Sequence, residues 1–99
     1  MTSYRLVFRK RARREWEKLG ETVRRQFRKK LGERLRHPHV PGDRLSHPPH
    51  CYRIKLRKAG YRLIYRVVDD RILVIVVAVG QRERGEVYEE LDERLAEEE

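Results

Sequence analysis

Apolar and basic side chains alternate along residues 51–57. Every second position is apolar and the positions between are basic: Tyr52, Ile54 and Leu56 against Arg53, Lys55 and Arg57. Successive side chains of a β-strand point to opposite faces of its sheet, so this pattern is typical of a strand. We therefore expect a sheet with one face in a core and the other face presenting positive charge.

Two further strands are expected after this one. Residues 58–60 form a turn, and residues 61–68 again alternate. One face of this strand is mainly apolar and the other is partly basic: Tyr61, Leu63, Tyr65 and Val67 against Arg62, Ile64 and Arg66. Residues 69–71 turn the chain once more. Residues 72–79 are apolar throughout, which is typical of a strand buried on both faces and hence central in its sheet.

The N-terminal part of the chain predicts a short strand and a helix. Residues 4–8 are rich in strand formers. Residues 9–19 follow a helical pattern with apolar positions at Ala12, Trp16 and Leu19. Gly20 is placed to end this helix as its C′ residue, the position at which glycine is favoured.

A second helix is expected from Thr22. Its apolar residues follow one another at steps of four: Val23, Phe27, Leu31 and Leu35. The two apolar stripes would face each other in a helical hairpin that packs across one side of the sheet. Trp16 and Phe27 are therefore expected in the core rather than as platforms on which bases stack.

The remaining segments complete the predicted fold. Residues 37–50 contain four prolines and break every periodicity, so they are expected to form a loop. A terminal helix is expected from Glu86, with an apolar side formed by Val87, Leu91 and Leu95. The order of elements is then β-α-α-β-β-β-α. This predicts one α+β domain over residues 1–99, a mainly antiparallel four-stranded sheet with the helical hairpin on one face and the C-terminal helix at the edge.

Charge is unevenly distributed along the 99 residues. Residues 1–66 hold 21 Lys and Arg against 5 Asp and Glu, a net charge of +16. Residues 67–99 hold 4 against 11, a net charge of −7, which returns the total of +9. Such a surplus favours phosphate-bearing partners, because each cation that contacts a phosphate releases condensed counterions. Nucleic acid is favoured over anionic membrane, since no predicted helix pairs a basic face with a large apolar one.

The apolar segments and the cysteine content of the sequence predict the cellular compartment of the protein. There is no run of 18 apolar residues, and the first ten residues lack the apolar core of a signal peptide. The single cysteine, Cys51, excludes an internal disulfide framework. We expect a cytoplasmic protein that has no membrane partner.

Five residues could carry phosphoryl-transfer chemistry: Arg53, Lys55, Arg62, Arg82 and Tyr88. The first three share the basic face of neighbouring antiparallel strands, and the last two follow the central strand, where a loop and helix can lean over the sheet. Cations stabilise charge that builds on phosphate oxygens, and they lower the pKa of a neighbouring Tyr or Lys. The alternative is a solvated basic face, extended by Arg57 and Arg66, that only binds RNA phosphates.

Three segments resemble the RelE branch of the RelE/ParE superfamily of toxin–antitoxin modules: EWEKLGETVRRQF, CYRIKLRKAGYRLIYRVVD and VGQRERGEVY. The resemblance implies a ribosome-dependent endonuclease that cleaves mRNA in the ribosomal A site without a cofactor, metal or small molecule. It implies attack by the RNA 2′-hydroxyl, which leaves a 2′,3′-cyclic phosphate. It also implies a cognate RelB-like antitoxin as partner, besides the ribosome and mRNA.

The resemblance also assigns roles to the five residues. Tyr88 would be the general base toward the 2′-hydroxyl, with Lys55 stabilising its deprotonated form. Arg82 would be the general acid toward the leaving 5′-oxygen, a strained role for a group of such high pKa. Arg53 and Arg62 would hold the phosphate. The best-known family member has lysine at the position of Arg53, so an acid–base role there is doubtful while phosphate binding is retained.

Other functions and other sites stay open at this point. A ParE-like toxin that acts on DNA gyrase without catalysis is one alternative, although that branch generally lacks the full set of cations. An RNA- or ribosome-binding module that does not cleave is another. His37, His39, His47, His50 and Cys51 lie close together in sequence, but they match no zinc-site spacing, and an exposed loop is the simpler interpretation.

Overall fold

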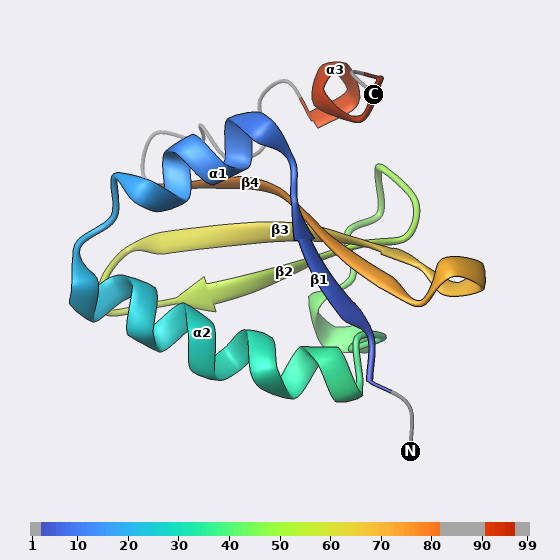
Figure 1. Ribbon diagram of the computed structural model, residues 1–99, viewed down its shortest axis with the longest axis horizontal. Helices are drawn as coiled ribbons and strands as arrows, with labels where there is room; N and C mark the ends of the chain where they lie inside the picture. Colours follow the sequence, from blue (N-terminus) through green and yellow to red (C-terminus); the bar gives the residue numbers. More distant parts are fainter. Residues whose placement is uncertain (1–2, 82–90, 97–99) are drawn as a thin grey trace.

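The computed structural model describes residues 3–81 and 91–96 (Figure 1). Its helices and strands are, in order, β1 Arg5–Phe8, α1 Lys10–Glu17, α2 Glu21–Arg36, β2 Cys51–Leu56, β3 Tyr61–Val68, β4 Leu73–Gln81 and α3 Leu91–Ala96. Two short 3₁₀ turns, η1 Pro41–Asp43 and η2 Asp69–Arg71, lie in the connections. The predicted order of elements is confirmed. The predicted start of the terminal helix, at Glu86, lies outside the described residues.

The four strands form one sheet in the order β1-β4-β3-β2. β2 pairs antiparallel with β3, β3 pairs antiparallel with β4, and β1 pairs parallel with β4. The prediction of a mainly antiparallel sheet is therefore confirmed. The wholly apolar strand is indeed central, since β4 has a partner on each side.

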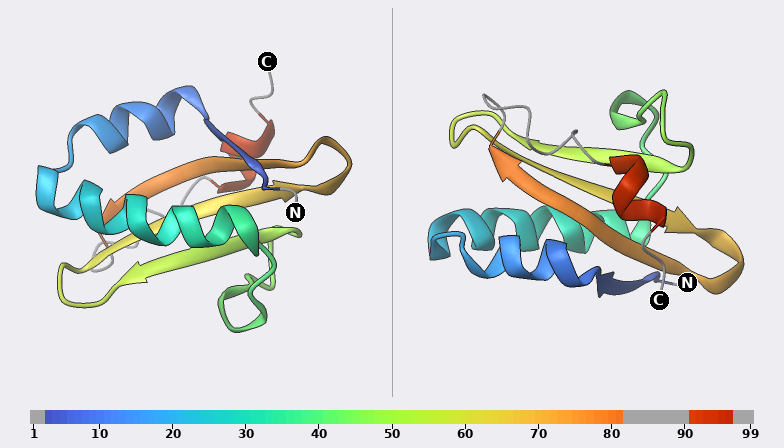
Figure 2. Two further views of the ribbon diagram at one scale, coloured as in Figure 1. Left: turned by 60° about the horizontal axis from the view of Figure 1, so that its bottom comes forward. Right: turned by 90° about the horizontal axis from the view of Figure 1, so that it is seen from above.

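The helical hairpin covers one face of the sheet and makes the larger core. Figure 2 shows α1 and α2 together on that side, and α3 on the other. The apolar residues predicted from alternation in β2 and β3 point into this core, where they meet Phe27 and Leu31 of α2. The ring centroids of Trp16 and Phe27 are 6.2 Å apart, so the stripes of the two helices do face each other. Phe27 is fully buried, but Trp16 is only partly buried.

A β-bulge interrupts the pairing of β3 with β4. Ile64 pairs with Ala78 and Tyr65 pairs with Val76, which leaves Val77 as an extra residue in β4. A bulge places two successive residues on the same side of a strand. Val77 and Ala78 therefore both contribute to the second face of the sheet.

The second face is not wholly cationic, which corrects the expectation from alternation. It carries its own small apolar cluster, covered by α3 and composed of Leu45, Cys51, Ile64, Val77, Ala78 and Leu91, with Leu95 packed against it. This cluster occupies the part of the face that lies under α3. The basic residues of β2 and β3 therefore do not form one continuous row, because this cluster lies between them along the strands.

Several predicted boundaries shift by a residue or two. α1 ends at Glu17, and Gly20 has extended geometry (φ −68°) as the residue before α2, so its assignment as the C′ residue of the first helix is wrong. α2 begins at Glu21 rather than Thr22. Ile72 precedes β4 in the left-handed region (φ 56°) with its side chain exposed, so the central strand starts one residue later than predicted. The left-handed region is unfavourable for a β-branched residue, and periodicity does not reveal such a conformation.

An ion pair ties α3 to α1 at the edge of β4. The Arg94 guanidinium pairs with the Glu15 carboxylate through two contacts of 2.8 and 2.6 Å. Glu15 also accepts a hydrogen bond from the backbone N–H of Val79 (3.0 Å), and Arg94 donates one to the carbonyl of Val77 (3.0 Å). These two backbone groups lie past Val76, the last residue of β4 that pairs with β1. The pair therefore satisfies backbone groups that β1 is too short to reach.

Within the described part of the chain, no helix has both the length and the apolar character that crossing a bilayer requires.

Candidate functional site

Lys55 and Arg62 lie directly opposite each other in the β2–β3 pair. Arg62 is in turn opposite Gly80 of β4, which contributes no side chain. Cβ atoms of directly opposed residues in an antiparallel pair are about 4.5–5.5 Å apart, so two cations are held side by side on the second face. Both side chains are partly exposed. We call this pair the cationic row.

Arg53 extends the cationic row by one step along β2. It lies opposite Ile64, and its Nε is 4.0 Å from Oδ1 of Asp43. Its side chain is 31% exposed. Asp43 belongs to η1 and also pairs with Arg34 of α2 at 2.6 Å. The Arg53 guanidinium therefore lies beside a carboxylate that already pairs with Arg34, and its role as a phosphate ligand stays a prediction.

Arg57 follows the end of β2 and is exposed, so it is not a strand residue as alternation suggested. Together with Lys55 it lines a hollow of about 350 Å³ at the edge of β2, next to Lys30 and Arg34 of α2. The predicted phosphate-binding position of Arg57 is thus joined by two helix cations that the sequence did not assign to this site. Their signal in the sequence was weak, because the basic run of residues 24–30 fits a solvated helix face as well as a contact with RNA backbone, and Arg34 lies one helical turn beyond it.

Arg66 is separated from the cationic row. It pairs with Cys51 at the start of β2, four residues along β3 from Arg62, which is about 14 Å at the usual rise of a strand. Ile64 and the apolar cluster under α3 lie on the same face between these positions. The structure therefore does not bring Arg66 together with Lys55 and Arg62. Arg82 and Tyr88 lie outside the described residues, so their roles stay predictions.

Cys51 is fully buried beneath α3. Burial, the largest cause, raises the pKa of its thiol to about 11. A thiol with such a pKa holds its proton at neutral pH and is a poor nucleophile or metal ligand. Packing is therefore the role that the structure supports for Cys51.

The histidine-rich loop forms hydrogen bonds rather than a metal centre. His39 contacts the hydroxyl of Tyr52 (3.0 Å) and the carboxylate of Asp69 (2.8 Å), and His47 contacts Asp92 of α3 (2.9 Å). Over residues 3–81 and 91–96, no group of three or more His, Cys, Asp or Glu side chains could hold a metal ion. The loop instead links the end of the sheet to α3.

The fold and the cationic row can now be set beside known proteins. Residues 6–85 match the family described as the ParE toxin of type II toxin–antitoxin systems. This match spans most of the chain, so the chain belongs to the ParE toxin family.

Within this family the similar relatives are RelE toxins, which confirms the resemblance stated from the sequence. The mRNA interferase toxin RelE of Escherichia coli is 50% identical over 93 residues, 94% of this chain and 98% of that protein. A free-state structure of a variant of E. coli RelE gives a TM-score of 0.87 at 48% identity, with coverage of 95% and 99%. The toxin in the E. coli RelBE toxin–antitoxin complex gives a TM-score of 0.78 at 49% identity, with coverage of 80% and 96%.

Proposed function

We propose that this chain is the toxin of a type II toxin–antitoxin system, and that it inhibits translation as a ribosome-dependent endonuclease that cleaves mRNA in the A site. The relative that is 50% identical is an mRNA interferase, and the alignment with it covers nearly the whole of both chains. The observation that carries the proposal is that Lys55 and Arg62 lie opposite each other and are partly exposed on the second face. Action on ribosomes places the protein in the cytoplasm.

The proposed reaction is an attack of the RNA 2′-oxygen on the adjacent phosphorus. A bond forms between these atoms, the bond from phosphorus to the 5′-oxygen breaks, and a 2′,3′-cyclic phosphate remains. Tyr88 takes the proton of the 2′-hydroxyl, and Arg82 gives a proton to the leaving 5′-oxygen. Lys55 stabilises the deprotonated tyrosine, and it acts with Arg62 on the charge that develops on the phosphate oxygens.

Arg53 has a positioning function in this proposal. Its planar guanidinium can bind two phosphate oxygens at once, and its Nε lies 4.0 Å from Oδ1 of Asp43. The high pKa of arginine argues against proton exchange at this position. Arg57 then extends phosphate contact along the RNA beyond the scissile bond, whereas Arg66 would contact RNA only at the distant end of β3.

The proposed protein partner is a RelB-like antitoxin, as in the RelBE complex of E. coli. A basic active face favours an acidic, partly disordered segment that folds on binding. The terminal helix is the element for such a segment to displace, because in α3 it is held by a small apolar contact and the Arg94–Glu15 pair. Failure of the neighbouring reading frame's product to relieve toxicity on co-expression would contradict this pairing.

A ribosome-programmed cleavage assay tests the function. Purified chain is mixed with ribosomes that carry a defined mRNA, and primer extension is expected to show cuts in phase with the A-site codon. The Arg82→Ala, Tyr88→Phe variant is expected to bind ribosomes but to lose cleavage. Full cleavage by this variant would contradict the assigned roles, and an inactive wild type that still binds ribosomes would indicate a binding module.

The match to a ParE family also calls for a test of the second candidate, a toxin of DNA gyrase. Induction of such a toxin would produce DNA breaks and leave mRNA without codon-phased cuts. The cationic row favours the ribonuclease. Both outcomes can be read from one culture by extracting RNA and DNA after induction.

A further inference from the structure

The hairpin helices have a large positive net charge. Four basic and two acidic residues lie in α1, and seven basic and two acidic residues lie in α2. The two helices therefore have a net charge of +7, against +9 for the whole chain. They cover the face of the sheet that lies opposite the cationic row, so the proposed reaction makes no use of this charge apart from Lys30 and Arg34 beside Arg57.

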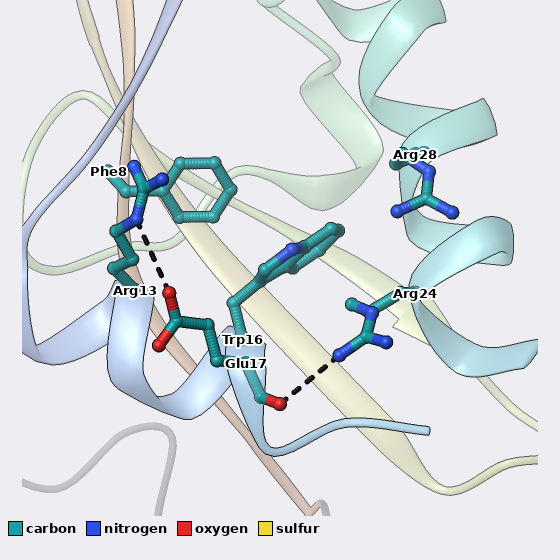
Figure 3. A pocket seen from close by; sticks show the side chains of 6 residues that line it. All are labelled: Phe8, Arg13, Trp16, Glu17, Arg24 and Arg28. Carbon is teal, nitrogen blue, oxygen red and sulfur yellow. Dashed lines mark hydrogen bonds and ion pairs between the residues drawn. The ribbon is translucent and has the colours of Figure 1, made fainter. Parts of the chain in front are cut away.

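A pocket of about 230 Å³ opens between α1 and α2 on this side of the sheet. Its lining combines two aromatic rings with three arginines and one glutamate: Phe8, Trp16, Arg13, Arg24, Arg28 and Glu17. Figure 3 shows the indole of Trp16 between Phe8 on one side and the guanidinium groups of Arg24 and Arg28 on the other. The ring centroids of Phe8 and Trp16 are 5.3 Å apart, so the indole is held against a second ring.

The cations of the pocket are held by pairs that phosphate can replace. Arg28 and Arg24 reach the carboxylate of Glu21 at 2.7 and 3.2 Å, and Arg13 lies 3.6 Å from Glu17. The side chains of Arg13 and Arg28 are 68% and 51% exposed, and exposed pairs contribute only about 0–1 kcal/mol. Arg24 also donates to the carbonyl of Glu17 (3.2 Å), which fixes its guanidinium beside the indole.

We propose that this pocket takes one unpaired nucleotide of RNA, with its base stacked on Trp16 and its phosphates on Arg24 and Arg28. Aromatic faces combined with guanidinium groups are the chemistry that binds single-stranded RNA. The pocket is smaller than the roughly 300–1,000 Å³ of sites that enclose a free small molecule, so one planar group of a larger partner is the fitting occupant. The inference rests on the proposed function, because that function brings the chain to the ribosome, where RNA can supply an unpaired nucleotide.

Trp16 is the only tryptophan in the sequence, so its fluorescence reports directly on the pocket. The probes are a short 2′-O-methyl oligouridylate and an abasic strand with the same number of phosphates. We expect saturable quenching with the base-bearing strand and little quenching with the abasic strand. Equal quenching by both strands would overturn the proposal, because it would show phosphate binding without stacking.

A matched pair of double variants distinguishes the effect of the pocket on RNA binding from the effect of the overall charge of α2. Arg24→Gln with Arg28→Gln removes the cations of the pocket, whereas Arg25→Gln with Lys29→Gln removes the same charge from the neighbouring exposed positions. The first double variant is expected to weaken binding of the base-bearing strand several-fold more than the second. Equal weakening would overturn the proposal. Circular dichroism melts confirm that both variants are folded.

Binding to ribosomes that carry no mRNA tests whether ribosomal RNA supplies the nucleotide. Trp16→Leu is expected to weaken binding to such ribosomes by about 5- to 150-fold, the loss of one base stack, and Trp16→Phe is expected to restore part of it. Unchanged binding of the Trp16→Leu and Arg24→Gln, Arg28→Gln variants would overturn the proposal, even if wild-type cleavage of mRNA upheld the proposed function. Quenching by an antitoxin peptide, with none by RNA, would also overturn it. The pocket and the neighbouring apolar groove, lined by Leu6, Leu31 and Leu35, would then belong to a protein partner.

Discussion

The two faces of the sheet differ in how much apolar surface they bury. Among the described residues, thirteen buried residues join the cluster under α1 and α2, whereas six join the cluster under α3. The first face is covered along the strands by two helices (Figure 2). On the second face the six-residue α3 covers the smaller cluster, and the cationic row lies further along the strands.

This difference indicates that the first face mainly stabilises the fold and that the second face mainly serves function. Burial of apolar surface supplies most of the free energy of folding, so the first face holds the chain together. The second face leaves Lys55 and Arg62 exposed enough to meet a substrate, and its cover is small enough to open locally. Local opening at low cost suits a face that must bind either RNA or an antitoxin.

Truncation of the larger core should have the largest effect. Phe27 is fully buried, and Phe27→Ala is expected to lower the free energy of unfolding by about 3–5 kcal/mol. Leu91→Ala, at a buried position under α3, should cost clearly less because α3 can detach while the rest stays folded. Urea unfolding followed by circular dichroism measures both. Equal losses would show that the two faces stabilise the fold equally.

Removal of a cation from the row should affect rate rather than stability. Lys55→Met is expected to lower the rate of mRNA cleavage on ribosomes by about 10²–10³-fold, the usual cost of losing one group that stabilises developing charge. Its free energy of unfolding should change by no more than about 0.5 kcal/mol, because the side chain is partly exposed. Lys58→Met in the adjoining turn is the charge-matched control. A similar loss of rate in the control would contradict a specific role for Lys55.

The ion pair between Arg94 of α3 and Glu15 of α1 links the helices on the two faces of the sheet. Glu15→Gln or Arg94→Gln alone is expected to cost about 1–3 kcal/mol, because the remaining partner is left with an unsatisfied polar group. The double variant should cost less than the sum of the single variants. A double-mutant cycle in urea measures this coupling. Strict additivity would mean that the pair contributes nothing beyond its separate backbone hydrogen bonds.

The buried thiol on the second face should produce the smallest effect, visible only at high pH. Burial raises the pKa of Cys51 from 9.0 to about 11, so the folded state keeps a proton that the unfolded state loses. Its contribution to stability is complete below pH 9 and is lost as the pH rises toward 11. Wild type should therefore lose more stability than Cys51→Ala between pH 9 and 11. Identical pH slopes would contradict a thiol buried in the folded state.

Periodicity predicted the elements and faces well, because both depend on side chains close together in sequence. Alternation placed Lys55 and Arg62 on one face, and the short turn between their strands brought them opposite each other. It missed the bulge at Val77, which moves one residue of a uniformly apolar strand to the other face. It also misplaced Arg66, because sharing a face does not imply proximity along it.

The sequence by itself determined the class of fold, the cationic character of β2 and β3, and membership of a toxin family. Only the tertiary structure decided which cations meet. It divided the second face between the cationic row and the cluster under α3, joined Arg94 to Glu15 across 79 positions, and left Trp16 open to a pocket between two helices. The physical reason is that local patterns specify which way a side chain points. The path of the chain, the strand register and the packing of helices specify what that side chain meets.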